Sequence, residues 1–64
     1  MITNLDGWNF GDKFIDPQFG WVGVFHSFDT IEEHDVIRFW KPNPFGTNEY
    51  TRYVSDWARD CEEI

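Results

Sequence analysis

The sequence predicts an α+β domain in which three antiparallel strands form a sheet packed by one C-terminal amphipathic helix. Two patterns lead to this class: β-branched and aromatic residues alternate in the middle of the chain, and the C-terminal third changes to a helical period. Length adds a third constraint. With 64 residues, the chain is too short to form two cores, so we expect one small domain over residues 1–64.

The N-terminal third is predicted to be an irregular arm followed by a short strand. Residues 1–10 mix turn formers with apolar side chains, and we expect Trp8 and Phe10 to fold back over the domain as a lid. Residues 11–16 read as the first strand, ended by Pro17 and Gly20.

The second strand, residues 21–28, is the most regular β segment. Simple alternation places His26 and Phe28 on one face, and it places Gly23 on the other face, where its missing side chain leaves room for a bulge or a bulky neighbour. Residues 29–34 break the apolar pattern and residues 35–40 resume it, so an antiparallel hairpin is expected. Residues 41–46 contain Pro42 and Pro44 and are predicted to be a rigid loop.

The C-terminal third predicts a helix of about four turns. Its apolar stripe consists of Tyr50, Tyr53, Val54, Trp57, Ala58, Cys61 and Ile64. Thr47 or Asn48 can serve as the N-cap, and Tyr53, Val54 and Trp57 are expected to anchor the helix on the sheet. Two acids near its end, Glu62 and Glu63, oppose the helix dipole.

Three segments resemble a known fold family. The runs 11–15, 20–24 and 36–40 are similar to the opening strands of Src-homology-3-like small barrels of the KOW type. The resemblance covers about the middle half of the chain and implies a small-barrel-like sheet in a non-catalytic binding module. The chain departs from that family because it lacks a basic surface and ends in a helical pattern.

Charge restricts the possible partners. Twelve acidic residues against five basic ones give a net charge of -7, which repels nucleic acids and anionic membranes and attracts basic proteins. No apolar run approaches the roughly 20 residues of a membrane span, and the N-terminus lacks an export signal. Cys61 has no partner for a disulfide, so we expect a cytoplasmic protein.

Catalysis and cofactors are not expected. Cys61 with His26 or His34 would be a possible nucleophile and base, but Cys61 lies on the apolar stripe, where a thiol acts as a small hydrophobe. The acids around His34 are ligand types that Ca²⁺ or Mg²⁺ prefers, yet their spacing departs from the calcium loop, so no metal is predicted.

The functional hypothesis is a small acidic protein-binding module that inhibits or modulates a larger partner by occupying its basic, nucleic-acid-binding surface, as short phage-type inhibitors do. The alternative is a structural subunit of a permanent complex. Phe45, on its stiff loop, is expected either to anchor the interface or to tuck against Tyr50. The predicted partner-binding residues are Asp29, Glu32, Glu33, Asp35, Phe45, Asp56, Asp60, Glu62 and Glu63.

Overall fold

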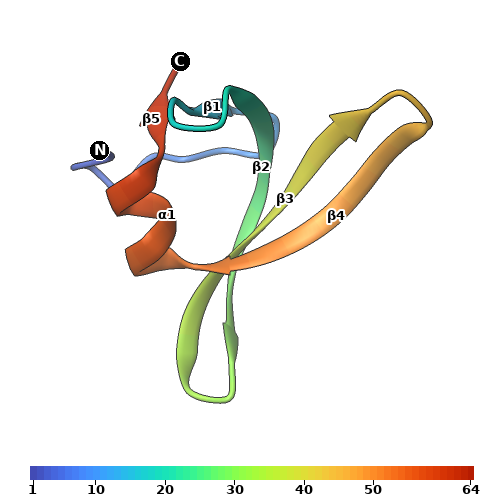
Figure 1. Cartoon of the computed structure of the whole chain (residues 1–64). Coiled ribbons are helices and arrows are strands. Elements are labelled where there is room, and N and C mark those ends of the chain that lie inside the picture. The colour runs from blue at the N-terminus through green and yellow to red at the C-terminus, as the bar shows by residue number, and fades with distance from the viewer.

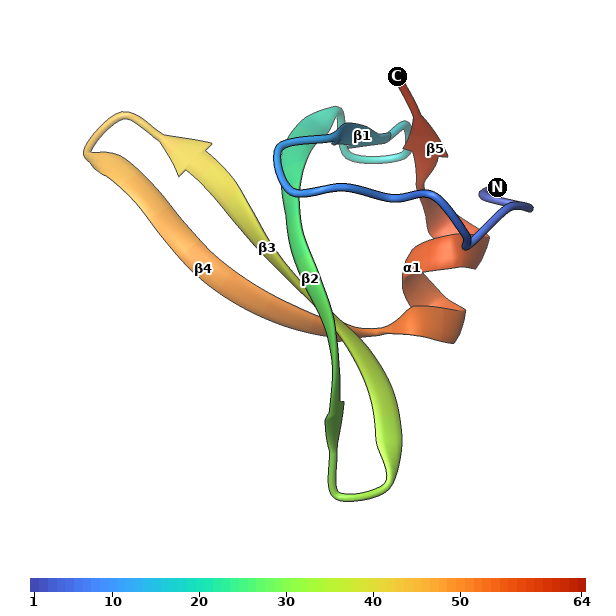
Figure 2. The ribbon, with the colours of Figure 1, turned by 180° about the vertical axis from the view of Figure 1, so that it is seen from behind.

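Five antiparallel strands and one short helix make up the fold in the computed structural model, which describes residues 1–64 (Figure 1). The elements are β1 (Lys13–Asp16), β2 (Trp21–Ile31), β3 (His34–Asn43), β4 (Gly46–Tyr53), α1 (Val54–Asp60) and β5 (Glu62–Glu63). Their order across the sheet is β4-β3-β2-β1-β5, so the first four strands form a meander and the last strand returns beside the first. Seen from behind, the arm starts beside α1, crosses in front of β2 and continues into β1 (Figure 2).

The predicted three-stranded sheet is wrong, because the C-terminal third contributes two further strands. Residues 49–53, expected in the first turn of the helix, instead belong to β4, which pairs with β3 along its length, with Tyr50 opposite Phe39. The threonine and tyrosine residues of this segment favour extended backbone, and pairing with β3 satisfies the hydrogen-bonding groups of one of its edges. The isolated helical stripe could not compete with that ladder.

The helix is therefore only seven residues long, from Val54 to Asp60. It does pack on the sheet, as predicted, through Trp57, which is fully buried. Tyr53 is half exposed and belongs to β4, so it is not a helix anchor. Glu62 and Glu63 lie in β5 beside β1, which removes their conflict with the helix dipole.

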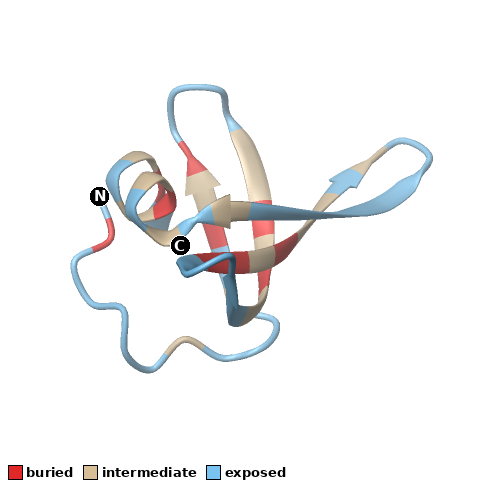
Figure 3. Cartoon of the chain, turned by 90° about the horizontal axis from the view of Figure 1, so that it is seen from below, coloured by how far each residue is buried: buried red, intermediate tan, exposed pale blue.

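The β2–β3 hairpin turns more tightly than predicted, and a second hairpin, β3–β4, forms where a rigid loop was predicted. β2 and β3 continue to Ile31 and His34, leaving a two-residue loop, and β3 and β4 continue to Asn43 and Gly46. Residues 41–46, predicted to be a rigid loop, are thus mostly strand, and Phe45 lies at the tip of the β3–β4 hairpin. The β2–β3 and β3–β4 hairpins project from the rest of the molecule (Figure 1), and the β3–β4 hairpin carries exposed residues at its tip (Figure 3).

A bulge in β2 changes which face Phe28 occupies. The register with β3 shifts between Phe25 and Ser27, leaving His26 without a partner residue. Phe28 consequently packs against Phe25 and Trp57, on the core side, and not with His26 as simple alternation predicts. His26 faces outwards, in contact with Phe10 and Trp40.

The core lies where β1, β2, β3 and α1 meet, and aromatic rings dominate it. Its buried apolar residues are Ile2, Phe14, Phe25, Ile37, Phe39, Trp57 and Cys61. The predicted folding-back of the arm is confirmed: Ile2 donates its N–H to the Ala58 carbonyl at 2.7 Å, and the Trp8 ring packs 5.0 Å from that of Trp57. These contacts seat the arm against the helix.

The tip of the β2–β3 hairpin holds two glutamates in a conformation that suits glycine better. Glu32 and Glu33 have φ angles of 50° and 70°. Two-residue hairpin loops of this shape favour Asn-Gly, because other L-residues crowd Cβ against the backbone. We expect Glu32→Asn with Glu33→Gly to stabilise the fold by about 1 kcal/mol. Chemical denaturation would measure the gain, and Glu32→Gln with Glu33→Gln, which keeps the strain, should show none.

Candidate functional site

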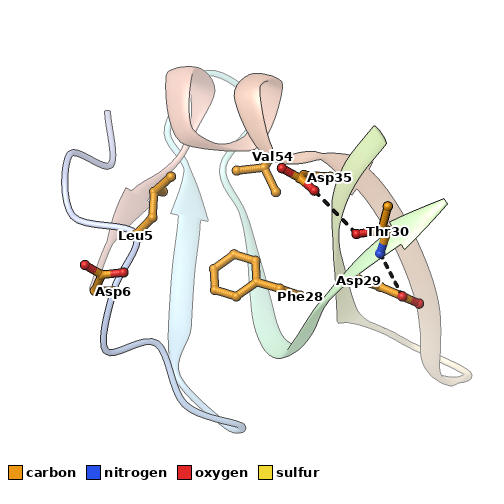
Figure 4. A pocket seen from close by; sticks show the side chains of 7 residues that line it. All are labelled: Leu5, Asp6, Phe28, Asp29, Thr30, Asp35 and Val54. Carbon is orange, nitrogen blue, oxygen red and sulfur yellow. Dashed lines mark hydrogen bonds between the residues drawn. The ribbon is translucent and has the colours of Figure 1, made fainter. Parts of the chain in front are cut away.

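A groove between the arm, the β2–β3 hairpin and α1 is the candidate site (Figure 4). Its volume is about 370 Å³, and we name it the arm groove. Its floor is apolar, whereas acidic side chains stand on both walls. The lining residues are Leu5, Asp6, Phe28, Asp29, Thr30, Asp35 and Val54.

The floor is assembled from three separate parts of the chain. Leu5 comes from the arm, Val54 begins α1, and Phe28 reaches the groove because the bulge turns it towards the core side. Two hydrogen bonds shape the arm here: Trp8 Nε1 donates to the Asn4 carbonyl at 3.1 Å, and the Asp6 N–H donates to Asn4 Oδ1 at 3.0 Å. Leu5 and Phe28 remain 39% and 44% exposed, so the floor is open to a ligand.

The carboxylates on the walls differ in how far they are neutralised. Asp29 accepts hydrogen bonds from the Thr30 N–H and from Arg38 Nε, at 2.7 and 2.8 Å, and these bonds lower its pKa. Asp35 accepts only a long hydrogen bond, 3.4 Å, from the Thr30 hydroxyl. Neither Asp35 nor Asp6, on the opposite wall, takes part in an ion pair.

A second hollow of about 580 Å³ extends the arm groove along α1. It shares Leu5, Asp35 and Val54 with the first and adds the side chains of Tyr53 and Ala58. An extended segment with an apolar side chain could therefore continue from one hollow into the next.

The ion pairs show where negative charge remains. Three arginines and the α-amino group neutralise the acids Asp16, Asp29, Glu49, Asp56, Asp60 and Glu62. The acids without an ion pair are Asp6, Asp12, Glu32, Glu33, Asp35 and Glu63. Four of these six belong to the arm groove or to the hairpin beside it, which makes this side the uncompensated acidic face.

The predicted binding residues are not brought together at one place. Asp29 and Asp35 line the arm groove, while Glu32 and Glu33 stand at the hairpin tip. Phe45, at the tip of the other hairpin, is 99% exposed, so it does not tuck against Tyr50. The helical acids are paired, Asp56 with Arg59 and Asp60 with both Arg59 and Arg52, and Glu62 and Glu63 lie on β5.

Sequence reasoning missed five of the groove residues: Leu5, Asp6, Phe28, Thr30 and Val54. A partial signal was present, because the arm was predicted to fold back and its Leu5-Asp6 pair would then bring an apolar and an acidic side chain over the core. Only the position of α1 shows which part of the domain the arm meets.

The residues considered for catalysis and metal binding lie apart from the groove. Cys61 is fully buried, and this desolvation raises the pKa of its thiol to about 11, so the thiol is protonated at neutral pH. His26 Nδ1 lies 2.7 Å from the Ser27 hydroxyl, and the exposed His34 ring contacts Tyr53. No three histidine, cysteine or acidic side chains converge as a metal site would require, and no helix has the length and apolarity to cross a membrane.

Stability should decrease at acidic pH because of the paired carboxylates. The hydrogen bond from Arg59 lowers the pKa of Asp60, and the bonds from Thr30 and Arg38 lower that of Asp29. A carboxyl group with a lowered folded-state pKa stabilises the fold above its unfolded pKa of about 4, and this contribution is lost as the pH falls below it. Denaturation at a series of pH values should show the loss. Asp60→Asn should flatten the profile, whereas Glu63→Gln, which removes an unpaired acid, should retain its slope.

Comparisons with protein-family models, with curated proteins and with solved structures find no match to this chain. Function is therefore argued from the site alone.

Proposed function

We propose that this chain is a small acidic protein-binding module that occupies a basic surface on a larger protein. A surface that otherwise holds nucleic acid is the expected target, because a dense set of carboxylates resembles phosphate in charge. The module would then inhibit or modulate its partner by competing for that surface. A cytoplasmic location belongs to the same proposal, since the single buried Cys61 forms no disulfide.

The arm groove is the observation that carries this proposal. Its floor of Leu5, Phe28 and Val54 suits the aliphatic part of a lysine or arginine side chain. The unpaired carboxylates of Asp6 and Asp35 stand where they can receive the cationic end. A groove of this composition selects a basic partner and disfavours an acidic or purely apolar one.

The hairpin tip adds long-range attraction to this contact. Glu32 and Glu33 are exposed and make no ion pair, and their backbone conformation would be less strained with asparagine and glycine at these positions. Charges of this kind mainly raise the association rate, and their effect decreases with ionic strength. The helical acids Asp56 and Asp60 are expected to contribute less, since Arg59 and Arg52 already neutralise them.

The experiment is an affinity capture from the native host at low and high salt, followed by binding kinetics with the captured protein. Asp6→Asn with Asp35→Asn should weaken binding by about tenfold or more, in line with the loss of one or two charge-assisted contacts. Glu32→Gln with Glu33→Gln should slow association and flatten its salt dependence. The captured partner should release the module when its nucleic acid is added.

Asp56→Asn is the matched control, because it removes a carboxylate that Arg59 already pairs with on the same molecule. It should leave the association rate nearly unchanged. Equal affinities for the Asp6/Asp35 variant and the parent would remove the groove from the mechanism. Capture that is unaffected by salt would contradict charge-led binding altogether.

A structural subunit is the second candidate, and the exposed aromatic side chains favour it. Phe45 and Phe19 are 99% and 72% exposed, which suits an apolar, permanent contact. Binding that persists at high salt would favour this candidate over the charge-led one.

A further inference from the structure

The two edges of the sheet differ in how well they are protected. β5 has two residues, both glutamates, so it offers little to another strand. β4 has eight residues, contains neither proline nor lysine, and pairs with β3 without a register shift. All of its residues except the partly buried Arg52 are exposed. A long, regular and uncovered edge of this kind is a template for a further strand.

The register identifies which groups face this free edge. Residues of an antiparallel strand alternate between bonding to one neighbour and facing away from it. Pro42, which lacks an N–H, lies opposite Thr47, so that pair is a non-bonded one. The residues that direct N–H and C=O groups away from β3 are therefore Thr47, Glu49, Thr51 and Tyr53.

This edge is complementary to itself. When two copies of β4 run antiparallel with Tyr50 opposite Tyr50 of the second copy, Glu49 meets Thr51 and Thr47 meets Tyr53, which are all free-edge residues. Asn48 then lies opposite Arg52, and no like charges face each other. A register shifted by two residues in one direction would instead place Glu49 opposite Glu49 of the second copy, so that two negative charges would face each other.

The same register gives Phe45 a place to bind. Phe45 precedes Thr47 by two residues, so in this register it would lie beside the end of β4 in the second copy. A hollow of about 350 Å³ lies there, lined by Thr51, Tyr53 and Asp56. Phe45 is 99% exposed in the single chain and stands at the tip of a hairpin that leads away from its own core (Figure 1). By two-fold symmetry each copy would fill the hollow of the other.

We propose that two copies of this chain associate through their β4 edges, in the register centred on Tyr50. The contact continues the sheet across both copies and inserts Phe45 of each beside β4 of the other. It uses the free edge of β4, whereas the arm groove lies between the arm, the β2–β3 hairpin and α1; Tyr53, at the end of β4, is shared with the hollow that extends the groove. Each copy carries a charge of -7, so association should strengthen as salt screens the repulsion, the opposite of the salt dependence expected for a basic partner.

Sedimentation of the full chain from micromolar to millimolar concentration tests this proposal. The dimer fraction should rise with concentration and with salt. Thr51→Pro removes an N–H that faces the free edge while leaving the β3–β4 ladder intact, and Phe45→Ala empties the hollow; each should weaken the dimer by about tenfold or more. A chain that stays monomeric at every concentration and salt level overturns the proposal, including the case in which a strand of another protein covers β4.

Cysteine cross-linking tests the register without depending on the proline variant. In the proposed dimer the two copies of position 50 are directly opposite, at a Cα separation of about 4.5 Å that a disulfide can span. Tyr50→Cys should therefore form a covalent dimer under mild oxidation. Asn48→Cys is the matched control, because its two copies would lie roughly 13 Å apart along the strands. Cys61 is fully buried and should not interfere. Equal cross-linking of both variants would overturn the register.

Discussion

Trp57→Ala is expected to destabilise the domain by about 3–5 kcal/mol, which is close to the whole stability of a chain of this size. The Trp57 side chain is fully buried and packs against the rings of Trp8, Phe14, Phe25 and Phe28. It is the main contact between α1 and the sheet, and the arm rests on it. Its loss would leave a cavity that the short helix cannot fill. Denaturant unfolding followed by circular dichroism would measure the effect.

Ser55→Ala is a suitable control for this prediction, because Ser55 is an exposed residue of the same helix. Its unfolding free energy should lie within about 0.5 kcal/mol of the parent. A Trp57→Ala protein that unfolds at nearly the parent denaturant concentration would show that the helix and arm contribute little to the core.

Gly23→Ala is expected to cost about 1–3 kcal/mol, although alanine normally suits a strand better than glycine does. Gly23 lies opposite Phe14 on β1, and a Cβ at this position would overlap the Phe14 ring. That ring is itself fully buried and packed against Trp57 and Phe39, so it has no free space to move into. The methyl group must therefore strain the contact between β1 and β2.

A double-mutant cycle would isolate this contact. Phe14→Leu reduces the ring that causes the overlap, so Gly23→Ala should cost markedly less in the Phe14→Leu background than in the parent. If the two changes are simply additive in unfolding free energy, close packing of Phe14 over Gly23 is not the reason that glycine is needed there.

Local patterns predicted those parts of the fold that depend on neighbouring residues. The first strand, the turn over residues 17–20, the β2–β3 hairpin and the folding-back of the arm follow from turn residues and alternation, and all are present. The space at Gly23 was also predicted. Even so, the bulge at His26 was not located, and Phe28 was placed on the wrong face.

The segment 46–53 shows why the remainder could not be predicted. Tyr50 and Tyr53 are spaced as on one face of a helix, so the pattern favoured a helix, although threonine and tyrosine are residue types that favour strands. The outcome depended on the open edge of β3, to which β4 is paired through eight residues. β5 likewise exists only because β1, about fifty residues earlier in the chain, offers an edge to Glu62 and Glu63.

Some features of the candidate site likewise follow from the sequence, and others depend on the tertiary structure. The sequence by itself determined that the chain is acidic, carries a single cysteine and depends on aromatic rings for its core. Tertiary structure decided which carboxylates Arg38 and Arg52 neutralise, because these arginines reach acids on other elements. Arg59 pairs within its own helix, and Asp6, Asp35, Glu32 and Glu33 stay unpaired. The physical reason is that net charge depends only on composition, whereas ion pairing requires side chains to meet within about 4 Å.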